Sequence, residues 1–396
     1  MARSTDTLLA RLLELVEGEL AEAVRPRHRL HEQPELAHEE LRTATIVAQA
    51  LPVASTTVAG TGRLARIGGS QRTTLAIRAE LDGLPISERT NAPFSAAGET
   101  MHACGHDVHM AALVALARAA HMLGDTLPAA LLAVFQPSEE AFPSGAEQLA
   151  RGEALAAHAP AAVLAAHVHP ELPWGAVALD AGAVNASSDS FEIVIEGEPS
   201  HGAYPHHGRD PVLAIAQVVV SLHALATRRI DPLGATALNV GVLEGGFAEN
   251  VIPARARARA TIRALGAQDR LTLRELVAEV VAGVAAAHGC RGSAELVPGE
   301  PALVNDAQIV DHTRRLLSQA GFATAPEWRS CGSDDFSFYG EIAPVAMAFV
   351  GLDGAPGFVA RPLHHPELLP PDEAVGAVAR ALAALYAGAA ATLASA

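Results

Sequence analysis

Cys104 and His106 are the residues whose types and spacing first indicate chemistry in this chain. They belong to the motif Met-His-Ala-Cys-Gly-His-Asp at 101–107, ahead of an Ala/Leu-rich run at 111–123 that predicts a helix. A thiolate and an imidazole at a tight turn before a helix favour Zn, Mn, Co or Ni over Mg or Ca. The pair therefore predicts part of a transition-metal site.

Three further clusters of metal-ligating residue types lie next to apolar runs. Each cluster offers two neighbouring candidates, and of each histidine pair we expect only one to bind a metal. The clusters are Glu139 with Glu140, His167 with His169, and His364 with His365. Because ligand sites in parallel sheets form at the carboxyl ends of strands, we expect the fold to gather these clusters in one place.

The adjacent carboxylates of Glu139 and Glu140 suit two different tasks. On an extended segment, neighbouring side chains point to opposite sides. One carboxylate can then bind a metal while the other faces the attacking water as a general base. This division is what a metal-dependent hydrolase needs.

A second set of polar residues lies near the middle of the chain. His201 is in Ser-His-Gly-Ala-Tyr-Pro-His, Asn250 opens Asn-Val-Ile-Pro, and Arg263 ends a strand-like run. An imidazole, an amide and a guanidinium can bind a polarised carbonyl and a substrate carboxylate. We expect the alternating arginines at 255, 257 and 259 to lie on an exposed strand face. Most other histidines, His28 and His31 among them, have no partner that the sequence indicates.

Two styles of secondary structure position these residues. Short apolar runs at 75–79, 129–135, 161–166 and 344–350 alternate with helical patterns and predict an α/β domain with a largely parallel sheet. Between about 186 and 300 the order strand, helix, strand, strand, helix, strand predicts a separate α+β layer. We therefore expect a catalytic domain in two parts, residues 1–185 and 301–396, with residues 186–300 inserted.

Composition excludes several classes of partner. The length of 396 residues favours two domains. Lys+Arg 28 against Asp+Glu 44 gives a formal net charge of −16, which argues against nucleic acid or an anionic membrane as a partner. The odd number of cysteines, 3, argues against a disulfide framework and predicts a cytoplasmic protein.

Taken together, the motifs resemble one known superfamily. In chain order they are the Cys104 motif, Phe-Gln-Pro-Ser-Glu-Glu, Ala-Ser-Ser-Asp-Ser-Phe, the His201 motif, Asn-Val-Ile-Pro, Ser-Asp-Asp-Phe-Ser-Phe-Tyr and Leu-His-His-Pro. This series is similar to the aminoacylase/glutamate-carboxypeptidase superfamily of dinuclear metallopeptidases. The similar branch is the amidohydrolases, which include hippurate hydrolase, N-acyl-amino-acid amidohydrolases and auxin-conjugate hydrolases. Two departures are Glu80, where the family usually has Asp, and His169, where an aromatic residue is common.

The resemblance implies a fold and a set of roles. The fold is a phosphorylase/hydrolase-like α/β domain, with a mostly parallel mixed sheet flanked by helices. An inserted α+β ferredoxin-like domain serves as lid and homodimer interface. Two divalent ions (Zn, Mn, Co or Ni) would be bound by Cys104, His106, Glu140, His167 and His364. Glu139 would be the general base, His201 would stabilise the oxyanion, if necessary across the dimer, and Asn250 and Arg263 would bind the carboxylate of the amino-acid half.

The implied function is hydrolysis of an N-acyl-L-amino acid to a carboxylate and a free amino acid. The motifs do not specify the acyl group. One alternative is a metallo-dipeptidase or aminopeptidase of the same superfamily, which needs an acidic group for the free ammonium, with Asp334 or Asp335 as candidates. Another is a non-catalytic metal-binding protein, against which the spare carboxylate of the Glu139–Glu140 pair argues.

Overall fold

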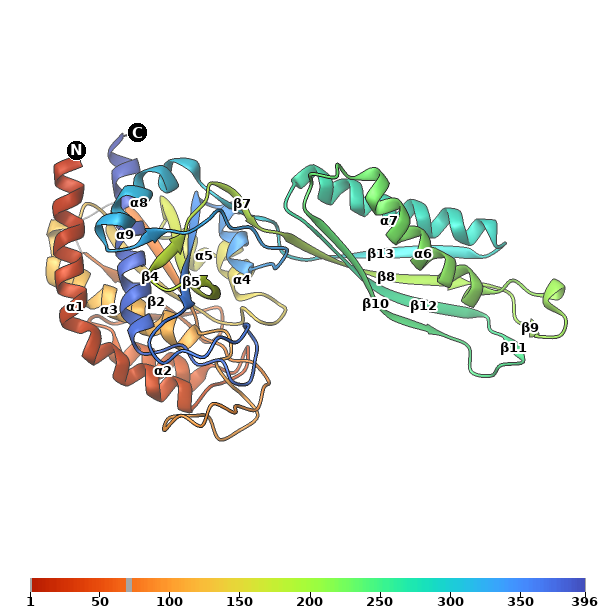
Figure 1. Cartoon of the computed structure of the whole chain (residues 1–396), viewed down its shortest axis with the longest axis horizontal. Coiled ribbons are helices and arrows are strands. Elements are labelled where there is room, and N and C mark those ends of the chain that lie inside the picture. Colours follow the sequence, from red (N-terminus) through yellow and green to blue (C-terminus); the bar gives the residue numbers. More distant parts are fainter. Residues whose placement is uncertain (1, 69–72, 396) are drawn as a thin grey trace. The chain divides into compact units, whose positions relative to one another are not determined.

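The chain folds into two compact units in this computed structural model, which describes residues 2–68 and 73–395 (Figure 1). Unit 1 comprises Met1–Gly182, Val304–Trp328 and Asp335–Ala396, and unit 2 comprises Ala183–Leu303 and Arg329–Asp334. An α/β unit built on a mixed sheet was expected and is found. The domain bounds 1–185, 186–300 and 301–396 stay a prediction, and each unit is described here by itself.

Unit 1 is built on an eight-stranded mixed sheet within the described residues. Four central neighbours, β4, β3, β5 and β16, run parallel, and antiparallel pairs flank them. The central strands are apolar and almost fully buried, as expected for strands covered on both faces. The order across the sheet is β1 (Thr56–Val58), β2 (Gly62–Ile67), β4 (Ala130–Gln136), β3 (Thr74–Glu80), β5 (Ala162–Pro173), β16 (Val345–Asp353), β6 (Ala176–Ala178) and β15 (Ala323–Thr324).

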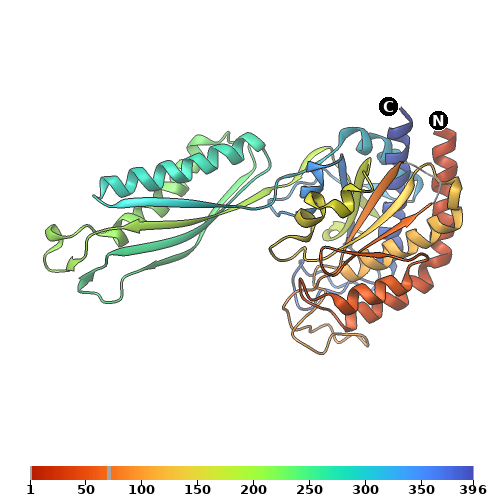
Figure 2. The ribbon, with the colours of Figure 1, turned by 180° about the vertical axis from the view of Figure 1, so that it is seen from behind.

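Helices cover this sheet and form one large apolar core with it. Helices α3 (His106–Leu123) and α9 (Glu373–Ser395) pack on the strands, and α1 (Ala2–Glu32) packs over both, as the two opposite views show (Figures 1 and 2). The remaining helical segments of unit 1 are α2 (Leu41–Ala50), η1 (Gly124–Thr126), α4 (Gly145–Arg151), α5 (Glu153–Ala156), α8 (Ala307–Gln319) and η3 (Asp335–Glu341). Short strands β7 (Gly182–Asn185) and β14 (Leu303–Asn305) pair where the chain passes between the units.

Unit 2 is an antiparallel sheet with two helices on one face. Its strands lie in the order β10 (Thr236–Gly245), β12 (Arg255–Ala264), β8 (Ser187–Glu196) and β13 (Arg291–Pro298). Alternate side chains of β8 and β12 are buried against α6 (Pro211–Arg229) and α7 (Ala267–Ala287). A two-stranded ribbon of β9 (Ser200–His201) and β11 (Val251–Ile252), followed by η2 (Pro205–His207), extends the unit. Arg255, Arg257 and Arg259 are exposed, as expected.

Two helices have the length and apolar composition of a membrane span. They are Pro211–Arg229 and Glu373–Ser395. Most of the second is buried inside unit 1, which is what the core helix of a folded domain also shows. The two helices are therefore weak evidence for membrane insertion.

Candidate metal centre

The carboxyl ends of the parallel strands of unit 1 bring the predicted ligands together. Atoms of Cys104, His106 and His167 lie within 4.8 Å of one another, and so do atoms of Cys104, Glu140 and His364. A third such group joins His106, Glu139 and Glu140. The three groups share members, and Cys104 belongs to two of them. The four sequence clusters therefore converge on one region.

Gly105 fixes the turn that presents Cys104 and His106. Its φ of +82° lies in the left-handed region. A Cβ built at this position would lie 2.6 Å from Cγ2 of Val168. Because α3 begins directly after this glycine, the two ligand candidates lie on either side of the helix start, against strand β5.

The histidines are oriented by backbone carbonyls. Nδ1 of His106 donates to the carbonyl oxygen of Asp82 at 2.8 Å, and Nδ1 of His167 donates to that of Val168 at 2.7 Å. Each bond leaves Nε2 as the unprotonated nitrogen when the ring is neutral. Nε2 of His167 lies 3.5 Å from Sγ of Cys104, and Nε2 of His106 lies 3.9 Å from Oε2 of Glu139.

Nε2 of His106 is the strongest sign of a missing ligand. Among the residues that the structure describes, this nitrogen is buried and has no hydrogen-bond partner. Buried polar atoms are nearly always paired, so an unpaired lone pair facing carboxylates and a thiol fits a cation. The donor set of sulfur, imidazole and carboxylate suits first-row divalent metals.

The electrostatics of the site agree with a cation between these groups. Burial lowers the pKa of His106, but the carboxylates of Glu80, Asp82 and Glu140 outweigh it and raise the pKa above its usual value. Burial holds the pKa of His167 well below its usual value, so this ring is neutral and can act as a ligand. A region that attracts a proton to one histidine also attracts a metal ion.

Glu139 and Glu140 differ from the prediction in one respect. They lie on an irregular turn after β4 instead of an extended segment, and Ser138 before them has a φ of +52°. Both carboxylates consequently reach the same group of atoms around His106, so the expected opposite orientation is wrong. Glu140 also approaches His364, with Oε1 3.2 Å from Nε2, and its pKa is lowered because the histidines outweigh burial.

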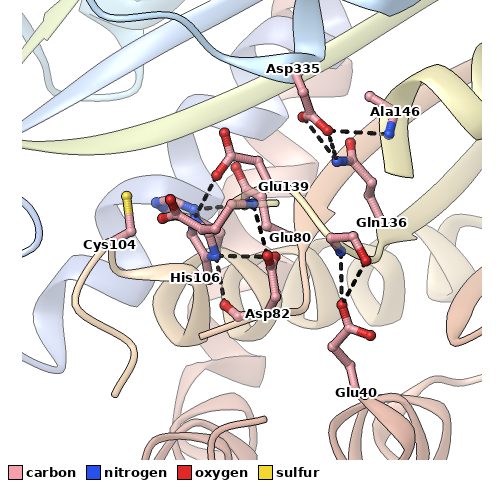
Figure 3. Close-up of polar contacts among 12 residues, drawn as sticks. Glu40, Glu80, Asp82, Cys104, His106, Gln136, Glu139, Ala146 and Asp335 are labelled. Carbon is pink, nitrogen blue, oxygen red and sulfur yellow. Dashed lines mark hydrogen bonds and ion pairs between the residues drawn. The ribbon is translucent and has the colours of Figure 1, made fainter. Parts of the chain in front are cut away.

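Residues behind the ligands hold the site in place (Figure 3). The backbone N–H of Glu140 donates to Oδ2 of Asp82 at 2.9 Å, so Asp82 supports both Glu140 and His106. His109 donates from Nδ1 to Oε2 of Glu80 at 2.8 Å and accepts from the N–H of Val168 at Nε2. Both nitrogens of His109 are thus used in hydrogen bonds, and this residue lies behind the ligands.

A buried ion network behind the start of α3 was missed from the sequence. Arg27 donates to Asp107 at 3.0 Å, and His31 lies between Asp107 (3.0 Å) and Glu88 (3.1 Å). His28 lies 2.9 Å from Asp372. His28 and His31 therefore have partners that the sequence did not indicate. The spacing of Arg27 and His31, four residues apart on one helix face, was the signal available.

A second buried network occupies one candidate for ammonium binding. The Asp335 carboxylate accepts from Arg78 (2.7 Å), Gln136 (2.7 Å) and the Ser144 hydroxyl (2.7 Å), and from the N–H of Ala146 (3.2 Å). Its residue is 1% exposed. Asp335 is therefore a structural group of unit 1, and its predicted alternative role as an ammonium site is wrong.

His201 and Asn250 lie side by side in unit 2. The pairing of β9 with β11 places His201 opposite Val251, and the N–H of Gly202 donates to the carbonyl oxygen of Asn250 at 2.7 Å. Nδ1 of His201 accepts from the N–H of Ala203 at 3.0 Å, which leaves Nε2 as the donor of the neutral ring. Both side chains are exposed.

Arg263 lies at the other end of the same unit. Strand β12 runs from Arg255, near the β9–β11 ribbon, to Arg263, a separation of eight residues or about 26 Å at ~3.3 Å each. Arg263 donates to the carbonyl oxygen of Cys331 at 3.1 Å. Asn250 and Arg263 of one chain therefore lie far apart along the sheet, and their shared binding of a substrate carboxylate stays a prediction.

Comparison with known proteins identifies the family. Residues 76–387 match the model of peptidase family M20/M25/M40. The chain is 32% identical to N-acetyl-L-cysteine deacetylase of Bacillus subtilis, over 86% of this chain and 81% of that protein. It is 34% identical to IAA-amino acid hydrolase ILR1-like 2 of Arabidopsis thaliana, over 89% of this chain and 82% of that protein.

A solved structure agrees with these relatives. The YXEP protein of Bacillus subtilis, described as a dinuclear metal binding peptidase from the M20 family, superposes with a TM-score of 0.82 and 28% identity. The match covers 94% of this chain and 98% of that one. The superfamily expected from the motifs is confirmed, and the chain belongs to peptidase family M20/M25/M40.

Proposed function

We propose that this chain is a metal-dependent amidohydrolase that cleaves an N-acyl-L-amino acid into a carboxylate and a free amino acid. One observation carries the proposal. Two oriented imidazole lone pairs, a thiol and two carboxylates converge at the strand ends, and a buried nitrogen of His106 has no partner among the described residues. Relatives named as deacetylases and as an amino-acid-conjugate hydrolase support the reaction class.

Five residues would bind two divalent ions. Cys104, shared by two of the atom groups, would contact both ions; the other ligands would be His106, His167, Glu140 and His364. When bound, such ions polarise the amide carbonyl and make water more acidic. Zn, Mn, Co and Ni all suit this donor set.

Glu139 is proposed as the general base. It follows β4 beside Glu140, and its carboxylate lies near Nε2 of His106. It would accept a proton from the attacking water and then donate it to the leaving amine, so that the C–N bond breaks as a neutral amine departs. His201, with Nε2 as donor, would stabilise the negative charge that develops on the carbonyl oxygen.

The positions of His201, Asn250 and Arg263 favour a homodimer in which unit 2 acts as lid and interface. Arg263 would bind the substrate carboxylate, whereas His201 and Asn250, about 26 Å or more away along the sheet, would serve the site of a second copy. The ferredoxin-like order of strands and helices in unit 2 is compatible with this role. A cytoplasmic location, from the three free cysteines, belongs to the same proposal.

A panel of substrates and one variant test the proposal. Chelator-stripped protein is assayed with Mn, Zn, Co or Ni added back, against N-acyl amino acids and free dipeptides. We expect metal-restored release of amino acid from acylated substrates. Glu139→Gln should lower kcat by about 10²–10⁴-fold because a general base is lost, while the bound metal per chain is unchanged.

Each arm of this experiment has an outcome against the proposal. Release from dipeptides alone would indicate a peptidase, and the same activity in Glu139→Gln would remove its assigned role. Glu153→Gln, a change of the same type in short helix α5, is the matched control and should leave turnover unchanged. Stoichiometric metal binding without turnover of any substrate would indicate a non-catalytic protein.

A further inference from the structure

Three aromatic side chains form a continuous wall beside a candidate ligand of unit 1. The wall consists of His169, Trp328 and Phe349. The rings of Trp328 and Phe349 lie 4.1 Å apart between centroids, and His169 lies 4.9 Å from Trp328 and 6.3 Å from Phe349. Phe, Trp and Tyr together make up only 4% of the chain, and two of them, Trp328 and Phe349, meet in this wall.

The strand register places the wall on the side of β5 that carries His167. Phe349 of β16 is the direct partner of His167 in the parallel pair, so the two side chains share one face at a strand spacing of about 4.8 Å. His169, two residues beyond His167, lies on that face as well. Two neighbours of His167 on this face, one across on β16 and one towards the end of β5, are therefore rings of the wall.

The wall is partly exposed to solvent, and hydrogen bonds to neighbouring residues hold it in place. Phe349 is 4% exposed and forms the base, whereas His169 and Trp328 are only partly buried. The N–H of Trp328 donates to Oδ2 of Asp180 at 3.0 Å, and Asp180 is also paired with Arg314 at 3.1 Å. The N–H of Glu171 donates to Nδ1 of His169 at 3.3 Å. Both partly buried rings are thus held by backbone hydrogen bonds and present a preformed surface.

We infer that this wall is the acyl-group subsite, with Trp328 as its main contact, and that the preferred acyl group is aromatic. The inference rests on the proposed amidohydrolase function and deepens it. An acetyl group is too small to cover two rings, whereas a benzoyl or larger aryl group buries its faces and edges against them. The carboxylate of the amino-acid half has no cationic partner in the wall and is expected to point away from it.

Selectivity between two matched substrates tests this assignment. For the Mn-loaded enzyme, kcat/KM is measured with N-benzoyl-alanine and N-acetyl-alanine, and wild type is expected to favour the benzoyl substrate. Trp328→Ala should lower the benzoyl-to-acetyl ratio about tenfold, and Trp328→Phe should restore most of it. Trp174→Phe changes the other tryptophan of the chain and should leave the ratio unchanged.

Three results would overturn the subsite. The first is a wild-type preference for the acetyl substrate. The second is an equal loss of kcat/KM on both substrates in Trp328→Ala. The third is a kcat/KM that depends on the amino-acid side chain instead of the acyl group. An equal loss would mean that Trp328 only supports the fold.

A binding measurement separates this inference from the proposed reaction. In Trp174→Phe protein, Trp328 is the sole tryptophan, so its fluorescence reports on the wall alone. Saturable quenching by benzoate, but not by acetate at the same concentration, is expected even if no panel substrate is turned over. Absence of any benzoate-specific change would overturn the subsite, whatever the activity.

Discussion

The two units of this protein bury charge in different ways. In unit 2, the Asp189 carboxylate is fully saturated: Arg270 donates to it at 2.6 and 2.8 Å and Arg274 at 2.7 and 2.8 Å. In unit 1, the groups around Cys104 instead leave Nε2 of His106 buried without a partner among the described residues.

The difference separates a structural group from a functional one. A saturated carboxylate ties helix α7 to strand β8 and has no capacity left for a ligand. A buried nitrogen without a hydrogen-bond partner costs folding free energy. When it faces other metal-ligating atoms, it indicates a place where an ion or a ligand binds. Unit 1 contains both types, because its buried Asp335 carboxylate accepts from Arg78, Gln136, Ser144 and Ala146 and is saturated.

The largest expected effect comes from removing the shared ligand candidate. Cys104→Ala should lower bound metal from two ions per chain to one or fewer, and kcat by at least about 100-fold, because both atom groups lose a member. Metal is measured by mass spectrometry of dialysed protein together with turnover. Cys290→Ala, in unit 2, is the control. Full metal content in Cys104→Ala would place the ions elsewhere.

An intermediate effect is expected when the buried Arg27–Asp107–His31 network of unit 1 is broken. Arg27→Met leaves the buried Asp107 without its guanidinium, which should lower the free energy of unfolding of unit 1 by about 3–5 kcal/mol. Urea denaturation followed by tryptophan fluorescence measures this, since both tryptophans lie in unit 1. The exposed pair Arg25–Glu22 provides the control: Arg25→Met should change stability by less than about 1 kcal/mol. Equal effects of the two variants would contradict the assignment.

The smallest expected effect is a difference in pH dependence. Burial lowers the pKa of His31, but Asp107 and Glu88 outweigh it and raise the pKa to about 9. Its stabilising contribution is full below its unfolded pKa of about 6.5 and is lost as the pH rises through 9. Burial raises the pKa of Asp189, but Arg270 and Arg274 outweigh it and lower the pKa to about 2. That contribution is full above about pH 4 and is lost as the pH falls towards 2.

Unit 1 should therefore lose the stabilisation from His31 at alkaline pH, and unit 2 should lose the stabilisation from Asp189 at acid pH. The urea midpoint of each unit, followed by pulsed hydrogen exchange at one labelling pH, distinguishes them. His31→Gln should flatten the alkaline loss in unit 1, and Asp189→Asn should flatten the acid loss in unit 2. Identical pH profiles for the two units would show that these residues do not control the difference.

Much of the candidate site could be predicted because local rules place it. Apolar runs mark the buried strands, parallel strands present their carboxyl ends at one edge, and the clusters around Glu140 and His167 follow such runs. The orientation of Glu139 and Glu140 could not be predicted, because it depends on the left-handed backbone at Ser138. The separation of Asn250 from Arg263 depends on the length and course of β12, which motif order does not contain.

The sequence by itself determined which donors are available, the class of metal that they suit and the family. Those properties depend on residue types and on spacings within short segments. Only the tertiary structure decided which donors are left unsatisfied, because their partners come from distant segments. Asp82 binds the backbone of Glu140, and Asp107 pairs with Arg27, 80 positions earlier in the chain. Whether a buried polar atom is paired is therefore a property of the fold, which short segments of the sequence do not contain.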